Sequence, residues 1–145
     1  MQGNKTVNKI KLSEQLKKHE GMRLKPYADT VGKLTLGIGR NLEDKGITEQ
    51  EALFMLSNDV NYFYREINKK LPWFKYLDGA RQNLLVNMAF NLGVAGLLSF
   101  KKMLNHCGDG HYDDAATEML NSKWANQVGY RAEELAEQMR TGEFQ

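Results

Sequence analysis

Hydrophobic residues alternate with small or polar ones at positions 34–38, and this period of two is typical of a strand. Before it, residues 29–32 have the composition of a turn, and Pro26 stands where an edge strand tolerates a proline. We therefore expect a small β-hairpin or a three-stranded meander within residues 22–39.

On either side of this segment the hydrophobic residues follow helical spacing. Hydrophobic positions from residue 10 onward predict a helix that ends at His19 or Glu20, because the next residue is a glycine. After the strands, Thr48 and Glu51 match a capping box with Thr48 as the N-cap. Hydrophobic residues then recur every three or four positions and predict one long helix over about 48–70.

Four further helices are expected after Pro72. Asp78 and Ser99 are typical of helix starts, and glycines are typical of helix ends. The expected ranges are 78–93, 99–108, 109–124 and 130–140. The predicted fold class is therefore α+β, as one domain built from a polar lead-in (1–9), a small α+β lobe (about 10–47), a connecting helix (about 48–70) and a helical lobe (about 71–145).

Composition narrows the class of protein. With 145 residues, 41% of them hydrophobic and 26% charged, the chain has the profile of one globular domain rather than of a disordered chain. A net charge of +2 falls short of the basic profile of nucleic-acid-binding domains, so no nucleic-acid partner is expected. No run approaches the roughly 20 apolar residues of a membrane span. The N-terminus lacks the apolar core of a signal peptide, which predicts a cytosolic product.

Disulfide and metal chemistry are not expected from the sequence. The single cysteine, Cys107, excludes intrachain disulfides and the zinc motifs that need several cysteines. The histidines are His19, His106 and His111, of which the last two lie five residues apart, and none belongs to an H-E-x-x-H motif. We therefore expect no metal.

Residues 19–40 contain the candidate chemistry. Glu20 is expected at a helix end, Asp29 at the hairpin turn and Thr35 on the returning strand, where Thr35 can neighbour Asp29. Glycoside hydrolysis uses two carboxylates, one as the acid and one to assist water or to attack the sugar. Spacing alone leaves an alternative open, because a chain with 18 acidic residues contains such pairs by chance. In this alternative, Glu20 is a solvated surface residue and Asp29 only forms a turn.

The same residues resemble the active-site signature of phage-type lysozymes of the T-even class, glycoside hydrolase family 24. The matching positions are Glu20, Gly21, Arg23, Leu24, Tyr27, Asp29, Thr30, Gly32, Thr35, Gly37, Ile38 and Gly39. Further matches occur at 57–60, 87–93, 122–127, 131–132 and 140–142. The resemblance covers nearly everything from residue 10 onward.

The resemblance implies a lysozyme-like fold and a reaction. The substrate would be the β-1,4 bond between N-acetylmuramic acid and N-acetylglucosamine in bacterial peptidoglycan, cleaved with inversion and without a cofactor. Glu20 would donate a proton to the glycosidic oxygen. Asp29 and Thr35 would position the attacking water, with Asp29 as base or electrostatic stabiliser.

Four residues are implied as substrate contacts. Phe90 matches a cleft aromatic of the family, although its helix also favours a place in the core. Asn91 stands where the T-even enzyme has a glutamine, and it is one methylene shorter. Gln127 is expected as an amide contact. Arg131 matches an arginine that pairs with the catalytic glutamate, or it is an ordinary surface cation.

One departure from the family affects an ion pair. Arg40 replaces a histidine, whereas the acidic partner of that histidine is retained as Asp59. If Arg40 and Asp59 meet, a titrating pair has become a permanently charged one, and stability would vary less between pH 5 and 8 than with a histidine.

The resemblance also implies a biological setting. An endolysin would remain in the host cytoplasm and act on the periplasmic wall once the membrane is permeabilised by a holin. It would be a monomer, with no stable membrane association. Two alternatives remain: a lytic transglycosylase acting on the same bond, which would need only Glu20, and a non-catalytic wall-binding protein on a lysozyme fold. The presence of Asp29 and Thr35 argues against both.

Overall fold

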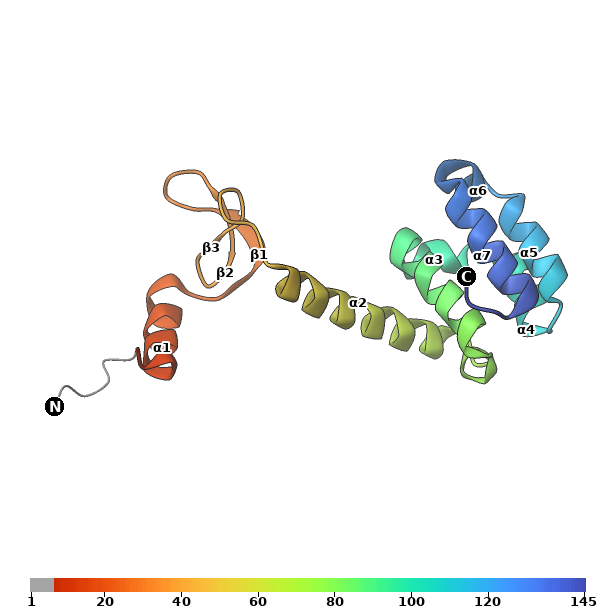
Figure 1. The fold of residues 1–145 in the computed structure, drawn as a ribbon, viewed down its shortest axis with the longest axis horizontal. Helices are drawn as coiled ribbons and strands as arrows, with labels where there is room; N and C mark the ends of the chain where they lie inside the picture. Colours follow the sequence, from red (N-terminus) through yellow and green to blue (C-terminus); the bar gives the residue numbers. More distant parts are fainter. Residues whose placement is uncertain (1–6) are drawn as a thin grey trace. The chain divides into compact units, whose positions relative to one another are not determined.

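The computed structural model describes residues 7–145, so residues 1–6 of the expected lead-in lie outside the described part. The described chain contains seven α-helices, one 3-10 helix and three strands, which confirms the α+β class (Figure 1). It divides into two compact units between Leu53 and Phe54, inside the long helix α2 (Glu49–Lys70). We call them the small unit and the helical unit, and describe each by itself.

The small unit contains α1 (Lys9–Glu20) and an antiparallel sheet in the order β1-β2-β3. Its strands are β1 (Arg23–Ala28), β2 (Leu34–Gly37) and β3 (Arg40–Asn41). Of the two expected forms, a hairpin or a three-stranded meander, the structure has the meander, with its third strand just beyond the expected range of 22–39. The side chain of Asn8 caps α1 by accepting a hydrogen bond from the backbone N–H of Lys11.

The central strand β2 sets the register of the sheet. Thr35 lies opposite Tyr27 on β1 and opposite Asn41 on β3. The pairing of β1 with β2 shifts between Arg23 and Tyr27, and Pro26 lies within that irregular stretch of an edge strand. A proline is tolerated there because it has no N–H to give to a ladder.

The start of α2 confirms the expected capping box. The N–H of Glu51 donates to Thr48 Oγ1 at 3.1 Å, and the N–H of Thr48 donates to Glu51 Oε1 at 2.9 Å. Two backbone donors at the helix start are thus satisfied reciprocally.

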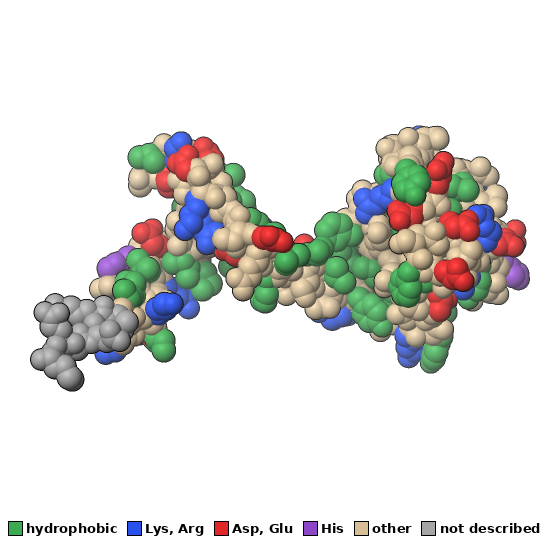
Figure 2. All heavy atoms as spheres, in the orientation of Figure 1, with side chains coloured by type: hydrophobic (Ala, Val, Ile, Leu, Met, Phe, Trp, Pro, Cys, Tyr) green, Lys and Arg blue, Asp and Glu red, His purple; other side chains and the backbone are tan. Residues whose placement is uncertain are grey.

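The helical unit contains the rest of α2 and the remaining helices. They are η1 (Phe74–Tyr76), α3 (Gly79–Leu98), α4 (Lys101–Gly108), α5 (Tyr112–Leu120), α6 (Lys123–Val128) and α7 (Tyr130–Thr141). Both tryptophans, Trp73 and Trp124, belong to this unit. Figure 2 shows acidic and basic side chains interspersed on its visible face.

Helix α3 supplies the largest share of the core. Its buried residues are Ala80, Leu84, Leu85, Val86, Met88, Ala89 and Leu97. Among residues 7–145, no single helix is long and apolar enough to cross a membrane. Helices α3 and α4 together meet that criterion by length and composition, but they are bent by 100°.

Two expected helix boundaries in this unit are wrong. Helix α3 is interrupted at Gly93, where a helix end was expected, because the φ of this residue is +78° and non-helical. Beyond Gly93, however, the helix resumes and continues to Leu98. Ser99 therefore ends α3 instead of opening the next helix, and its hydroxyl donates to the carbonyl of Gly96. A serine satisfies backbone groups at either end of a helix, so the residue type alone does not decide whether Ser99 begins a helix or ends one.

The expected helix over 109–124 is also wrong. Asp109 belongs to the end of α4, and Gly110, with a φ of +79°, separates α4 from α5. Helix α5 ends at Leu120, and Ser122 then caps the separate helix α6 by accepting a hydrogen bond from the N–H of Ala125. Trp124 lies in α6, where it is buried.

Candidate active site

Glu20 is the last residue of α1, and its side chain is exposed. Gly21, with a φ of +74°, ends the helix, and its N–H donates to the carbonyl of Lys17. The carboxylate lies against the turn between β2 and β3, because a Cβ added to Gly39 would be 3.0 Å from Glu20 Oε2 and 3.2 Å from its Cδ. The absence of a side chain at Gly39 therefore leaves room for this carboxylate.

Replacing Gly39 with alanine is expected to lower activity more than stability. The φ of Gly39 is +72°, where an L-residue costs about 1 kcal/mol. The new methyl group also displaces the Glu20 carboxylate by a few tenths of an ångström, and misplaced catalytic groups lose rate steeply. We expect a loss in kcat/KM of about tenfold in a peptidoglycan-clearing assay.

The matched control is Gly46→Ala. Gly46 has a similar φ of +67°, but a Cβ there would meet only a backbone oxygen at 3.9 Å. Both variants carry the same backbone cost, so equal activities would mean that the contact with Glu20 has no catalytic consequence.

Asp29 forms the turn between β1 and β2. Its Oδ1 accepts hydrogen bonds from the N–H groups of Val31 at 3.0 Å and Lys33 at 2.8 Å, and its own N–H donates to the carbonyl of Lys33. Within residues 7–145, no protein group donates to Oδ2. One carboxylate oxygen therefore fixes the turn, and the other is available to a ligand.

Thr35 lies on the same face of the hairpin, diagonally from Asp29. Thr35 pairs with Tyr27, and Asp29, two residues beyond Tyr27, exchanges hydrogen bonds with Lys33, two residues before Thr35. Thr35 is 3% exposed, and its hydroxyl donates to the carbonyl of Lys33, the same oxygen that accepts from Asp29. Lys33 was not expected from the sequence, because its contribution comes from main-chain atoms that carry no residue-specific signal.

The two carboxylate-bearing residues lie towards different ends of β2. Asp29 belongs to the turn before this strand, and Glu20 contacts the turn after it. A strand of four residues spans roughly 10 Å at 3.3 Å per residue. This placement favours a wide separation, which leaves space for water, over the roughly 5 Å typical of retaining enzymes.

The sequence raised Asp59 as a conditional partner of Arg40, and the structure instead pairs Arg40 with Glu51. Its guanidinium donates from Nη1 to Glu51 Oε1 at 2.7 Å and to the carbonyl of Gly46 at 3.2 Å. Glu51 lies in the first turn of α2, whereas Asp59 is eight residues, or about 12 Å, further along the helix. Arg40 therefore links the sheet to the start of α2.

This pair predicts a particular dependence of stability on pH. The hydrogen bond from Arg40, followed by those from Thr48, lowers the pKa of Glu51 from 4.5 to about 2. Because the folded-state pKa lies below the unfolded one, the stabilisation is complete above about pH 4.5 and is lost as the pH falls towards 2. Glu51→Gln should therefore lower the unfolding midpoint at pH 6, by an amount that shrinks towards pH 2.

Thermal unfolding between pH 2 and 7 measures this effect. Glutamine keeps the capping role, so the difference reports the charge. Glu49→Gln, in the same helical turn, is the control and should show no such dependence. A deficit in Glu51→Gln that stays constant across the range would contradict the prediction.

In the helical unit, Phe90 is 45% exposed and lines a pocket of about 370 Å³. Leu56 and Val60 of α2 line the same pocket, and the ring of Phe90 packs edge-to-face on Phe63 at 5.7 Å. Phe90 thus faces a pocket instead of the core, and its contact with substrate stays a prediction.

Arg131 lines the same pocket as Phe90. Its Nε and Nη2 donate to Asn87 Oδ1 at 3.0 and 2.7 Å, and Nη2 also reaches the carbonyl of Asn87 at 3.3 Å. Asn87 therefore orients the guanidinium, a role that was not expected from the sequence.

Asn91 and Gln127 lie near a different pocket. Asn91 Oδ1 accepts a hydrogen bond from Trp124 Nε1 at 2.8 Å, and Gln127 lines a pocket of about 580 Å³ with Trp124 and Phe100. The structure thus separates the four expected substrate contacts into two pairs. The amide NH₂ of Asn91 donates no hydrogen bond among the described residues, so it is available to a ligand.

The family model for phage lysozyme matches residues 17–141. Probable T4-type lysozyme 1 of Dictyostelium discoideum is 31% identical over 160 residues, covering 90% of this chain and 94% of the relative. The endolysin of Acyrthosiphon pisum secondary endosymbiont phage 1 is 28% identical, covering 76% of this chain and 74% of the relative.

A longer protein also contains a matching region. The pre-baseplate central spike protein Gp5 of Enterobacteria phage T4 is 28% identical over 164 residues, covering 94% of this chain but 28% of the relative. The matched family region spans both units of the structure, and includes Glu20, Asp29 and Thr35. The chain therefore belongs to the phage lysozyme family of glycoside hydrolases.

Proposed function

We propose that this lysozyme hydrolyses the β-1,4 bond between N-acetylmuramic acid and N-acetylglucosamine in peptidoglycan, with inversion at the anomeric carbon. The observation that carries the proposal is the placement of Glu20 and Asp29 towards different ends of β2, each with an available carboxylate oxygen. That arrangement has room for a water molecule between Asp29 and the sugar, as inversion requires.

Glu20 acts as the general acid in this proposal. Its proton passes to the glycosidic oxygen as the bond from that oxygen to the anomeric carbon breaks. Its exposure and the space beside Gly39 support this role, since the carboxyl must reach a bound polymer.

Asp29 acts as the base on the other face of the sugar. Water attacks the anomeric carbon and loses a proton to Oδ2, the oxygen that the turn leaves without a protein donor. Thr35 is almost fully buried, so the structure favours support of the turn through Lys33 over direct contact with bulk water. We propose Thr35 as a positioning residue for Asp29.

The four residues of the helical unit take the role of substrate contacts. The exposed ring of Phe90 offers an apolar surface to the face of a sugar, and Arg131 offers donors to a carboxylate of the wall polymer. The amide groups of Asn91 and Gln127 offer donors to hydroxyl and N-acetyl groups.

An endolysin role is the biological setting that we propose. A relative named as an endolysin matches three quarters of this chain, which supports host-cell lysis as the purpose. In this setting the protein is a monomer in the host cytoplasm, with neither a nucleic-acid partner nor a stable membrane association. It reaches the periplasmic wall after a holin permeabilises the membrane.

Mass spectrometry of the fragments released from purified peptidoglycan tests the reaction. Hydrolysis yields muramic acid at a free reducing end. Anhydromuramic products would instead establish a transglycosylase and remove the need for Asp29 as base. If no fragments appear while the protein still sediments with the wall, the protein is a binding module. The anomeric configuration of the first product, followed by NMR, distinguishes inversion from retention.

A further inference from the structure

The backbone between α4 and α5 brings two histidines together. The N–H of His111 donates to the carbonyl of His106 at 2.8 Å, and the N–H of Gly110 donates to that of Cys107 at 3.1 Å. This pair of bonds, with Gly110 in the left-handed conformation, is a common helix C-terminal motif that folds the chain back on itself. As a result, the rings of His106 and His111 lie 6.2 Å apart between centroids.

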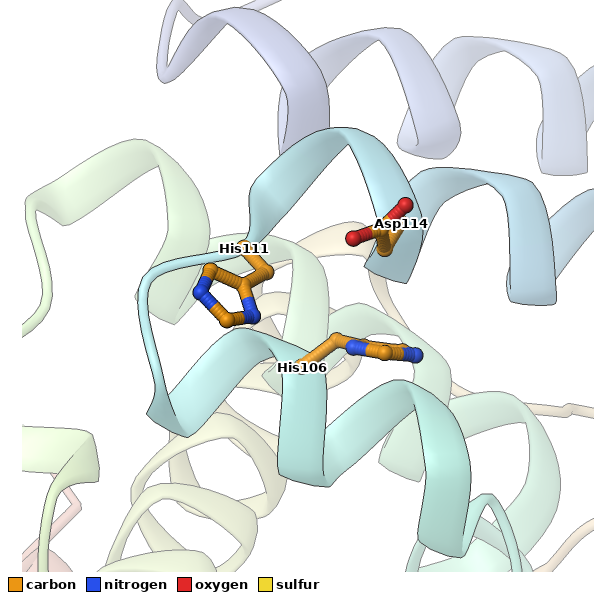
Figure 3. A group of neighbouring side chains, drawn as sticks. All are labelled: His106, His111 and Asp114. Carbon is orange, nitrogen blue, oxygen red and sulfur yellow. The ribbon is translucent and has the colours of Figure 1, made fainter.

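The next helix adds a carboxylate to this pair. His111 immediately precedes α5, and Asp114 follows three residues later in its first turn, on the same side of the helix. One ligand atom from each of His106, His111 and Asp114 lies within 4.8 Å of the other two (Figure 3). We call these three residues the corner cluster.

The corner cluster makes no polar side-chain contact elsewhere in the described part of the chain. Within residues 7–145, neither imidazole and no oxygen of Asp114 takes part in a side-chain hydrogen bond or an ion pair. His111 and Asp114 are exposed and line a pocket of about 340 Å³ that Arg140 also borders, while the guanidinium of Arg140 binds Glu137. Polar groups therefore converge here without a partner among residues 7–145.

We propose that the corner cluster binds one divalent transition-metal ion, with Zn²⁺ as the ion it suits best. Two imidazole nitrogens and one carboxylate oxygen are ligands that zinc takes, with a fourth position left to water. Ligand atoms at about 2.1 Å from a tetrahedral ion lie roughly 3.4 Å apart. Side-chain rotations that shorten the present 4.8 Å by about 1.4 Å reach that value, and the exposure of His111 and Asp114 permits them.

No metal was expected from the sequence, because two histidines five residues apart match no zinc motif. In the helix expected over 109–124, His111 and Asp114 also belong to one continuous helix that begins at Asp109. The observed break at Gly110 is what aligns both helices on one ligand set.

Metal binding here would join α4 to α5 across their connection. The cluster belongs to the helical unit, whereas Glu20 and Asp29 belong to the small unit. We therefore assign it a structural role, in which the ion stabilises the folded helical unit by binding it in preference to the unfolded chain.

Titration calorimetry on untagged, chelator-treated full-length protein tests the site with ZnCl₂ as the probe. We expect one equivalent of Zn²⁺ to bind and the thermal unfolding midpoint to rise as the concentration of free Zn²⁺ increases. Zinc binding should weaken at least tenfold in each of the variants His106→Ala, His111→Ala and Asp114→Asn. In known zinc sites, losing a residue that only hydrogen-bonds a ligand already weakens binding by about that factor. His19→Ala and Asp113→Asn are the matched controls and should bind like the wild type.

NMR of the imidazole resonances provides a readout that needs no variant to fold. Zinc should shift the ring signals of His106 and His111 and leave those of His19 unchanged. Cys107 is 1% exposed, so its thiol does not compete for the ion. The absence of binding heat at millimolar protein, equal weakening by the control variants, or shifts confined to His19 would each overturn the proposal.

Discussion

Glu20→Gln is expected to lower the rate of peptidoglycan hydrolysis by about 10²–10⁴-fold, the usual contribution of a general acid. The amide has nearly the same shape as the carboxyl group but has no acidic proton to give to the leaving oxygen. The fold should be unaffected, because the Glu20 side chain is exposed and takes part in no hydrogen bond among the described residues. The loss should therefore appear in kcat and leave binding to the wall intact.

Fragment release and co-sedimentation with the wall measure the two effects separately. Glu14→Gln is the matched control, since Glu14 is an exposed carboxylate on the same helix. It should retain full activity. A Glu20→Gln protein that releases fragments at the wild-type rate would show that Glu20 is not the acid, and would leave it the solvated residue that its spacing alone allowed.

The second large effect is expected at Asp29, where two substitutions separate chemistry from structure. Asp29→Asn retains an Oδ1 that accepts from Val31 and Lys33, so this variant keeps the turn but loses the charged base. Asp29→Ala removes both. We expect each variant to lose activity by about 10²-fold or more, and only Asp29→Ala to lose about 1 kcal/mol of stability as well.

Activity assays and amide exchange of the β1–β2 turn in the two variants decide between the roles of Asp29. If Asp29→Asn keeps activity within tenfold of wild type while Asp29→Ala does not, the residue is a turn former. In that case the proposed base must be another group. If both lose activity and only Asp29→Ala is destabilised, the charge at Oδ2 is what the reaction uses.

The parts of the fold that the sequence predicted correctly depend on short-range signals. The alternation over β2 and the reciprocal bonds of Thr48 and Glu51 involve residues at most three apart, so local preference decides them. The boundaries around Ser99 and Asp109 could not be predicted in this way. Both residue types satisfy backbone groups at either end of a helix, and tertiary packing decides which end they occupy.

The candidate site likewise combines residues that the sequence predicted with contacts that it did not predict. The resemblance identified Glu20, Asp29 and Thr35 as candidates, but their supporting contacts come from elsewhere. Asp29 is held by the main chain of Lys33, which no residue type signals. In the same way Asn87 orients Arg131 from 44 positions away, and that distance in sequence carries no periodic pattern.

The division between Leu53 and Phe54 also determines what an optical probe would report. Both tryptophans, Trp73 and Trp124, lie on the helical side of this boundary. Indole emission therefore follows the loss of the helical core, and neither indole belongs to the small unit that contains Glu20 and Asp29. A substitution that loosened only the β-hairpin would pass unnoticed in a fluorescence melt. The stability of the Asp29 variants is better followed by amide exchange of the β1–β2 turn.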